Sequence, residues 1–159
     1  MRVIEYTPER KQDFIDLNTW WIEEYFGKVE QADWDEFDHV DEEVAKGGMV
    51  FFAVDGEGRA LATCMAIDRG KGEWEIAKLG SDPNRPHKGC GKAVFEACVS
   101  WAESHGAHRI YILTNSSLSA AIHIYESHGF RRIYPEEFGG YERGDYALEK
   151  LVGGEEPES

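Results

Sequence analysis

The sequence is poor in cysteine and contains no long apolar segment. Its three cysteines, Cys64, Cys90 and Cys98, are odd in number and lack metal-ligand spacing, so we expect no metal site. Cys98 lies on the apolar face of a predicted helix, so a buried thiol is the favoured interpretation, and a reducing cytoplasm is the simplest compartment. No apolar run approaches the roughly 20 residues of a membrane helix, and the first residues lack the apolar block of a signal peptide. We therefore expect a cytoplasmic protein that does not use membranes.

Positive charge is also scarce. The chain has 17 lysines and arginines against 31 aspartates and glutamates, which gives a formal net charge of −14. Nucleic-acid binding requires a basic surface, so the charge argues against it. The field of the whole chain would attract cationic or amine ligands, and an anionic ligand would have to be held by local features. A purely solubilising role of the charge is at least as well supported.

The remaining composition is that of one globular domain. Of 159 residues, 42% are hydrophobic and 13% aromatic, which is enough for a real core. We predict a single domain over residues 1–152, followed by a disordered acidic tail at 153–159.

Hydrophobic periodicity predicts an α+β fold. Thr7 and Pro8 form a strong helix start, and glycines mark most of the later boundaries. The predicted helices cover residues 7–26, 33–46, 90–105 and 117–127. The predicted strands cover residues 2–6, 49–54, 59–67, 73–80, 109–114, 130–134 and 145–151.

A short glycine loop lies between the strand at 73–80 and the helix that follows. Free backbone N–H groups and an electropositive helix end suit a phosphate, and two lysines flank the glycines. The loop is neither a Walker loop nor a full dinucleotide fingerprint. Phosphate binding and a plain tight turn therefore have about equal support from this pattern alone. The loop reads His87-Lys88-Gly89-Cys90-Gly91-Lys92.

Three segments, in order, resemble the GCN5-related N-acetyltransferase (GNAT) family, including many of its bacterial small-molecule members. Residues 86–91 are similar to the cofactor loop Gln/Arg-x-x-Gly-x-Gly/Ala, and residues 141–149 are similar to the closing strand. The second segment matches at Asn115, Ala121, Tyr125, Gly129 and Phe130. The resemblance implies a GNAT fold with a mixed, mostly antiparallel sheet of about seven strands, about four helices and a V-shaped splay between the strands at 74–80 and 109–114.

The resemblance implies acetyl-CoA as co-substrate. Its pantetheine would pair with the backbone at Leu79, Gly80 and Ser81, and its pyrophosphate would bind the amides of His87, Lys88, Gly89, Cys90, Gly91 and Lys92. Pro86 stands where the family has Gln or Arg and offers neither a cation nor an N–H group, so Arg85 would have to compensate. Asn115 would contact the cofactor or an ordered water, although capping of the next helix explains it equally well.

The resemblance also implies two catalytic residues. Glu75 occupies a position where several family members place a carboxylate base, and its apolar neighbours would raise its pKa. A solvent-facing or ion-paired Glu75 is the equal alternative. Tyr125 matches the family's general acid, which protonates the departing thiolate. Without the resemblance, Tyr125 would be interpreted as a core aromatic residue.

The acceptor pocket of the family is walled by the first two helices and the loop before the last strand. Aromatic residues among acids suit a small amine or a peptide N-terminus. Arg143 would pair either with a substrate carboxylate or with its neighbours Glu142 and Asp145. The predicted substrate-binding residues are Trp21, Tyr25, Trp34, Tyr141 and Arg143.

We therefore expect an N-acetyltransferase that moves the acetyl group of acetyl-CoA directly to a primary amine of a small-molecule or amino acid-like acceptor, in a ternary complex. Ser81 stands where the family usually has an apolar residue. This departure and the one at Pro86 support a second hypothesis, a non-catalytic acyl-CoA-binding sensor. Family members often dimerise, so a homodimer stays open, although no residue pattern indicates one.

Overall fold

One mixed β-sheet organises the molecule. The computed structural model describes residues 1–134 and 144–153. Within that part of the chain, seven strands are ordered β1-β2-β3-β4-β5-β7-β6, and their neighbours pair antiparallel except for the parallel pair β4–β5. The predicted α+β architecture is confirmed. The strands are β1 (Arg2–Glu5), β2 (Met49–Val54), β3 (Ala60–Gly70), β4 (Glu73–Ser81), β5 (Arg109–Thr114), β6 (Arg131–Ile133) and β7 (Tyr146–Leu151).

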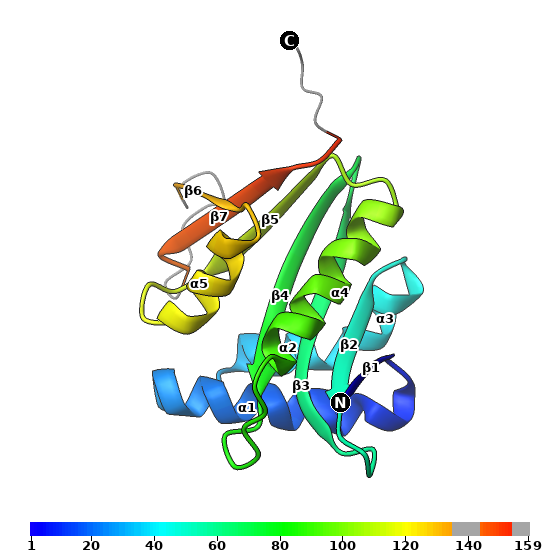
Figure 1. Cartoon of the computed structure of the whole chain (residues 1–159), viewed down its shortest axis with the longest axis vertical. Helices are drawn as coiled ribbons and strands as arrows, with labels where there is room; N and C mark the ends of the chain where they lie inside the picture. The colour runs from blue at the N-terminus through cyan, green and yellow to red at the C-terminus, as the bar shows by residue number, and fades with distance from the viewer. Residues whose placement is uncertain (135–143, 154–159) are drawn as a thin grey trace.

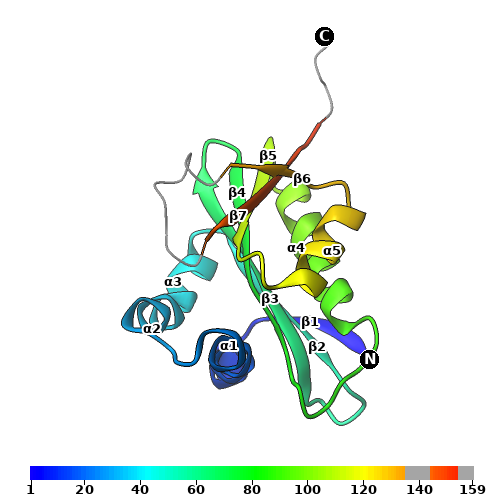
Figure 2. The ribbon, with the colours of Figure 1, turned by 90° about the vertical axis from the view of Figure 1, so that its left-hand side faces the viewer.

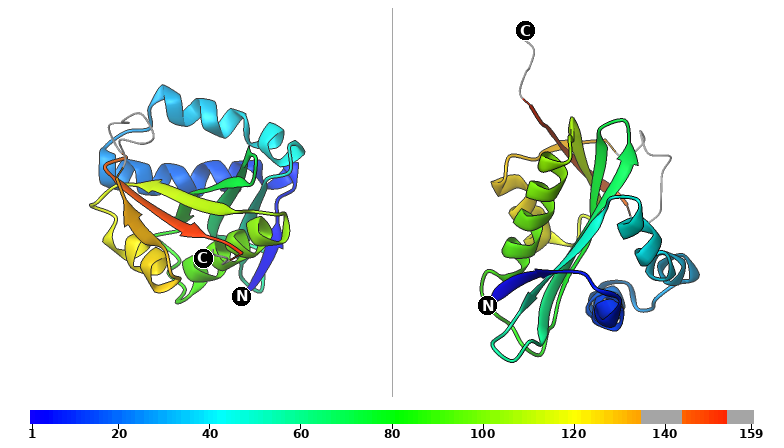
Figure 3. Two further views of the ribbon diagram at one scale, coloured as in Figure 1. Left: turned by 90° about the horizontal axis from the view of Figure 1, so that it is seen from above. Right: turned by 90° about the vertical axis from the view of Figure 1, so that its right-hand side faces the viewer.

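Helices cover both faces of this sheet. The first three lie on one face, and the other two lie on the opposite face (Figure 2). The N-terminal three are α1 (Lys11–Phe26), which follows a short 3-10 helix η1 (Pro8–Arg10), α2 (Gln31–Asp38) and α3 (Val40–Ala45). The opposite pair is α4 (Cys90–Ser104) and α5 (Ser119–Ser127). Views from above and from the other side show the same two layers of helices (Figure 3).

The prediction of one continuous helix over residues 33–46 is wrong. The helix ends at Asp38, and a new one begins at Val40, because His39 leaves helical geometry at φ −93° and ψ 6°. The imidazole of His39 bonds the carbonyl of Asp35 at 2.6 Å, which satisfies the end of α2. Phe37 and Val40 are both fully buried on either side of this break. The chain thus turns while keeping its apolar side chains on the core.

Strands β4 and β5 diverge soon after they meet. Their parallel register holds for Glu73 with Arg109, Trp74 with Ile110 and Glu75 with Tyr111. Beyond these pairs, residues 76–81 of β4 and 112–114 of β5 separate, and the two halves of the sheet open away from each other (Figure 1). The predicted V-shaped splay is confirmed. It leaves backbone polar groups on the facing edges available to a ligand that adds as an extra strand.

A β-bulge distorts β4 next to this opening. Thr63 pairs with Gly80 and Met65 with Ala77, so Lys78 and Leu79 together oppose Cys64. Lys78 has a φ of 59°, in the left-handed region that costs an L-residue about 1–2 kcal/mol. Bulges of this kind re-aim side chains beside functional sites.

Helix α1 packs very closely on β4 at Gly80. A Cβ at this glycine would lie 2.6 Å from Cδ1 of Trp21 and 2.8 Å from the carbonyl oxygen of Leu17. Only glycine therefore lets α1 come this close to the strand. The contact brings the side chains of α1 to one mouth of the V.

Candidate active site

A cavity of about 510 Å³ fills the V between β4 and β5. Its two edges are residues 76–81 of β4 and residues 112–115, which are the end of β5 and the residue that follows it. One end is walled by α1 and α2, through Trp20, Trp21, Glu24, Tyr25, Phe26 and Asp33. The other end is walled by α5 and the segment before it, through Leu118, Ala120, Ala121, Ile124 and Tyr125, with Gly91 of α4 nearby. The cavity thus passes through the sheet, from the α1 side to the α5 side.

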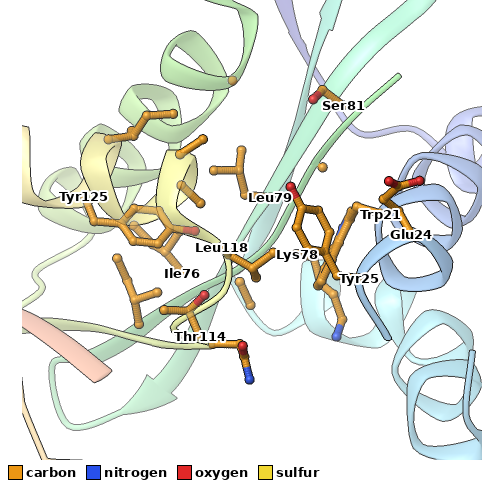
Figure 4. Close-up of a pocket in the computed structure, with 18 of the residues that line it drawn as sticks. Trp21, Glu24, Tyr25, Ile76, Lys78, Leu79, Ser81, Thr114, Leu118 and Tyr125 are labelled. Atoms are coloured by element: carbon orange, nitrogen blue, oxygen red, sulfur yellow. The ribbon is translucent and has the colours of Figure 1, made fainter. Parts of the chain in front are cut away.

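Tyr125 lies in this cavity at the end walled by α5. Its side chain is 5% exposed, packs against Phe95 with ring centroids 5.1 Å apart, and points its hydroxyl toward the opening (Figure 4). No hydrogen-bond partner for this hydroxyl is present among the described residues. Burial raises its pKa far above the ordinary value. The hydroxyl is therefore protonated and can donate a hydrogen bond to a ligand in the cavity.

The glycine loop leads directly into α4. Gly89 precedes the helix with a φ of 86°, and Gly91 lines the cavity. In the first turn, the N–H of Cys90 donates to the carbonyl of His87 at 3.2 Å, and the first bond of the helix runs from the N–H of Ala93 to the carbonyl of Gly89. The N–H groups of Gly91 and Lys92, which lie between these two, point from the N-terminus of the helix. Lys88 and Lys92 are exposed, and Cys90 is buried, which raises the pKa of its thiol. The arrangement fits an anion, and the thiol has little tendency to ionise.

Arg85 does not face the cavity. Its guanidinium lies 3.3 Å from the carboxylate of Asp82, which is 3% exposed and also accepts the N–H of Asn84 at 2.8 Å. Arg85 lines a second hollow beside α1 instead. His87 is exposed, with its Nδ1 atom 3.3 Å from the carbonyl oxygen of Lys88. Between the end of β4 and the first turn of α4, the residues that line the cavity are Pro83 and Gly91.

The other predicted cofactor contacts lie on the two strands. Leu79, Gly80 and Ser81 line the cavity along β4, and Asn115 lines it after β5. The side-chain oxygen of Asn115 accepts the N–H of Ser117 at 2.9 Å and so forms the turn before α5. Asn115 thus combines a local turn with a place on the cavity wall.

Glu75 is not part of the cavity wall formed by the described residues. Its carboxylate accepts two hydrogen bonds from Arg69, at 3.0 Å from Nε and 2.7 Å from Nη2. The residue is 9% exposed. Burial raises the pKa of this carboxyl, and the charge of Arg69 offsets that effect only in part. The structure therefore places Glu75 in an ion pair, beside the point where β4 leaves β5.

Two of the predicted substrate residues, Trp21 and Tyr25, line the cavity on the α1 side. Trp34 does not line it; this residue is 40% exposed and packs edge-on against Phe37 at 5.6 Å. Tyr141 and Arg143 lie outside the described residues. The predicted pocket residues omitted Lys78, Phe26, Thr114 and Leu118, which also line the cavity.

Lys78 was missed because no local signal marks it. Its side chain reaches the cavity from the bulge in β4 and forms an ion pair with Glu36 of α2. The bulge depends on how β3 and β4 align, which the residues around Lys78 do not reveal. The apolar residues on the wall, in contrast, follow from strand and helix periodicity.

Within residues 1–134 and 144–153, no three histidine, cysteine or acidic side chains are grouped so that they could hold a metal. None of the helices in this part of the chain has the length and apolar character to cross a membrane.

Comparisons with known proteins agree with this geometry. The Acetyltransferase (GNAT) family model matches residues 14–130. A comparison with curated proteins found no match. The fold is similar to an acetyltransferase of the GNAT family from Staphylococcus aureus Mu50, with 18% identity, a TM-score of 0.83 and coverage of 95% of this chain and 98% of that chain.

Two further solved structures show the same fold. An acetyltransferase from Streptococcus agalactiae 2603 has 17% identity, a TM-score of 0.81 and coverage of 95% and 98% of the two chains. A phosphinothricin acetyltransferase from Sinorhizobium meliloti, in complex with AcCoA, has 12% identity, a TM-score of 0.73 and coverage of 96% and 88%. The family match spans most of the chain, so this protein belongs to the Acetyltransferase (GNAT) family of acetyl-CoA-dependent acyltransferases.

Proposed function

We propose that the protein transfers the acetyl group of acetyl-CoA directly to a primary amine of a small molecule. The observation that carries this proposal is the hydroxyl of Tyr125, which is buried, has no partner among the described residues and is aimed into the V. A buried donor without an acceptor is unfavourable unless a ligand completes it. The sulfur of CoA, which leaves as a thiolate, is an acceptor of the right kind.

The cofactor would enter from the α4–α5 side. Its pantetheine would add to the free edge of β4 at Leu79, Gly80 and Ser81, as an extended chain adds to a sheet. Its pyrophosphate would lie at the N-terminus of α4, near Gly91 and the lysines Lys88 and Lys92. Cofactor affinity would depend on these amides and lysines, because Arg85 is engaged with Asp82.

The amine would enter from the opposite side, between β4 and α1. In this arrangement the nucleophile approaches the thioester carbonyl across the gap between the strands, and no acyl-enzyme is needed. Backbone N–H groups at the distorted part of β4 would hold the carbonyl oxygen as it gains negative charge. Tyr125 would then donate its proton to the departing thiolate.

We propose Glu75 as the base that removes the proton of the amine. Burial raises the pKa of its carboxyl, which makes the carboxylate a stronger base, and its position at the fork of β4 and β5 is next to the cavity residue Ile76. Because the carboxylate is bound to Arg69, the proton would reach it through water. A Glu75 that serves only the ion pair is the competing explanation, and the pH dependence described in the Discussion separates the two.

The test of the proposed function is the substitution Tyr125→Phe. We expect kcat to fall about 10²- to 10⁴-fold, the range of a general acid, with CoA affinity unchanged. Stability should be retained, because the substitution removes a buried hydroxyl that has no partner. Thiol release with an amine panel gives the rate, and calorimetry gives the affinity.

Tyr134→Phe is the matched control, because Tyr134 is 70% exposed and lies outside the cavity. An unchanged rate in Tyr125→Phe would remove Tyr125 from the acid role. Binding of acetyl-CoA without turnover on any amine would favour the sensor hypothesis. Absence of CoA binding would contradict both functions.

A further inference from the structure

We propose that the acceptor carries a second positive charge besides its reacting amine, and that Glu24 binds it between Trp21 and Tyr25. The substrate class would then be small diamines and related dications. This inference rests on the proposed function, since it concerns the acceptor end of the same cavity.

Glu24 is the starting point. It lies on α1 and lines the cavity together with Trp21 and Tyr25. The two aromatic side chains extend from the helix toward β4, and the carboxylate of Glu24 lies beside them along α1 (Figure 4). Glu24 is exposed, and its carboxylate has no partner among the described residues. A carboxylate that faces a cavity without a partner suits a cationic ligand group.

The aromatic wall beside Glu24 is held in place. The indole Nε1 of Trp21 donates to Oδ1 of Asn18 at 2.9 Å, and Nδ2 of Asn18 donates to the carbonyl of Phe14 at 2.8 Å. Asn18 is fully buried, and Trp21 also packs edge-on against Phe26 at 6.2 Å. An indole with a fixed orientation presents its face to a cation without losing further freedom on binding.

The other charged groups on this wall are already engaged. The ammonium of Lys78 is bound to Glu36, and its side chain is 12% exposed. A carboxylate oxygen of Asp33 accepts the N–H of Glu30 at 2.9 Å and caps α2. A substrate carboxylate would therefore meet Glu24 and find no unengaged cation on the described wall. The wall thus favours a dication over an amino acid.

The charge of the whole chain acts in the same direction. A net charge of −14 attracts a dication more strongly than a monocation and slows the approach of an anion. Apolar groups on the wall would also accept a monoamine with an alkyl tail, so the test compares ligands of equal length that differ only at the far end.

The experiment measures kcat/KM with acetyl-CoA and three acceptors: 1,5-diaminopentane, pentylamine and 5-aminopentanoate. We expect the diamine to exceed pentylamine about tenfold, the combined size of an exposed ion pair and a cation–π contact, with 5-aminopentanoate the slowest. Glu24→Gln should bring the ratio of kcat/KM for the diamine to kcat/KM for pentylamine close to one. Glu23→Gln, which changes the same charge at an exposed position outside the cavity, should retain it.

Equal kcat/KM for the diamine and pentylamine in the unaltered protein would overturn the inference while leaving the proposed function intact. A preference that survives Glu24→Gln would also overturn it. If no acceptor is acetylated, calorimetry of 1,5-diaminopentane with the CoA-bound protein decides. Binding that weakens about tenfold in Glu24→Gln supports the inference, and absence of binding refutes it.

Discussion

Replacing Gly80 with alanine tests how closely α1 packs against β4. The new methyl group would lie 2.6 Å from Cδ1 of Trp21 and 2.8 Å from the carbonyl oxygen of Leu17. The indole is fixed by Asn18, and the carbonyl belongs to the helix backbone, so neither atom can move alone. Overpacking of this kind costs about 1–3 kcal/mol. For a chain of this length, that loss lowers Tm by roughly 2–12 °C.

Urea denaturation followed by circular dichroism measures the effect on the free energy of unfolding, and calorimetry measures Tm. Gly56→Ala is the matched control, because a Cβ at Gly56 would meet no atom within 4 Å. The reasoning is refuted if Gly80→Ala unfolds within about 0.5 kcal/mol of the unaltered protein, the range of ordinary surface substitutions. A displaced α1 should also raise KM for the amine more than KM for acetyl-CoA, since α1 walls the acceptor end.

Two further predictions concern β4. Folding favours the protonated form of Glu75, so its contribution to the free energy of unfolding declines as pH rises from the unfolded pKa to the raised folded pKa. Glu75→Gln should remove this decline, which urea titrations between about pH 4 and 8 would measure. If Glu75 is the base, the substitution should also remove the acidic limb of the pH profile of kcat/KM. An unchanged pH profile of stability would contradict the first expectation, and an unchanged pH profile of kcat/KM would contradict the base role. Lys78→Gly should be more stable than Lys78→Ala by about 1 kcal/mol, because both lose the ion pair with Glu36 and only alanine retains the strain of positive φ. Equal stabilities in urea would show that the bulge relaxes.

Much of the fold could be predicted from the sequence, because local patterns and local structure agree. The buried apolar residues of α1, Phe14, Leu17 and Ile22, recur at helical spacing, and the predicted strand at 109–114 forms β5 with the same boundaries. The sequence did not predict the helix break at His39, because the helical spacing of apolar residues continues across it. Only packing against the sheet reveals that the chain turns there.

The candidate site could be predicted in part. The glycine loop was predicted from its own residues as a candidate phosphate site. The resemblance of motifs, which records position along the chain, then implied its cofactor and the role of Tyr125. The orientation of Arg85 could not be predicted in this way, because its guanidinium can bind either a phosphate or Asp82, three residues away in the sequence. Whether Glu24 lines the cavity depends on which face of α1 meets β4. That contact depends on Gly80, which is far from α1 in the sequence.

The short parallel junction between β4 and β5 has a consequence for the energetics of the whole domain. The contacts that join the two sheet halves include the three residue pairs of this junction and the ion pair of Arg109 with Glu73 at 3.2 Å. Phe95 of α4 also packs on Tyr125 and Phe130, and Nε2 of His128 lies 2.8 Å from the carboxylate of Glu96. A ligand that pairs with both facing edges would act as the missing central strand. Binding of this ligand would then stabilise the folded protein. The concentration of cofactor would therefore determine how cooperatively the two halves unfold.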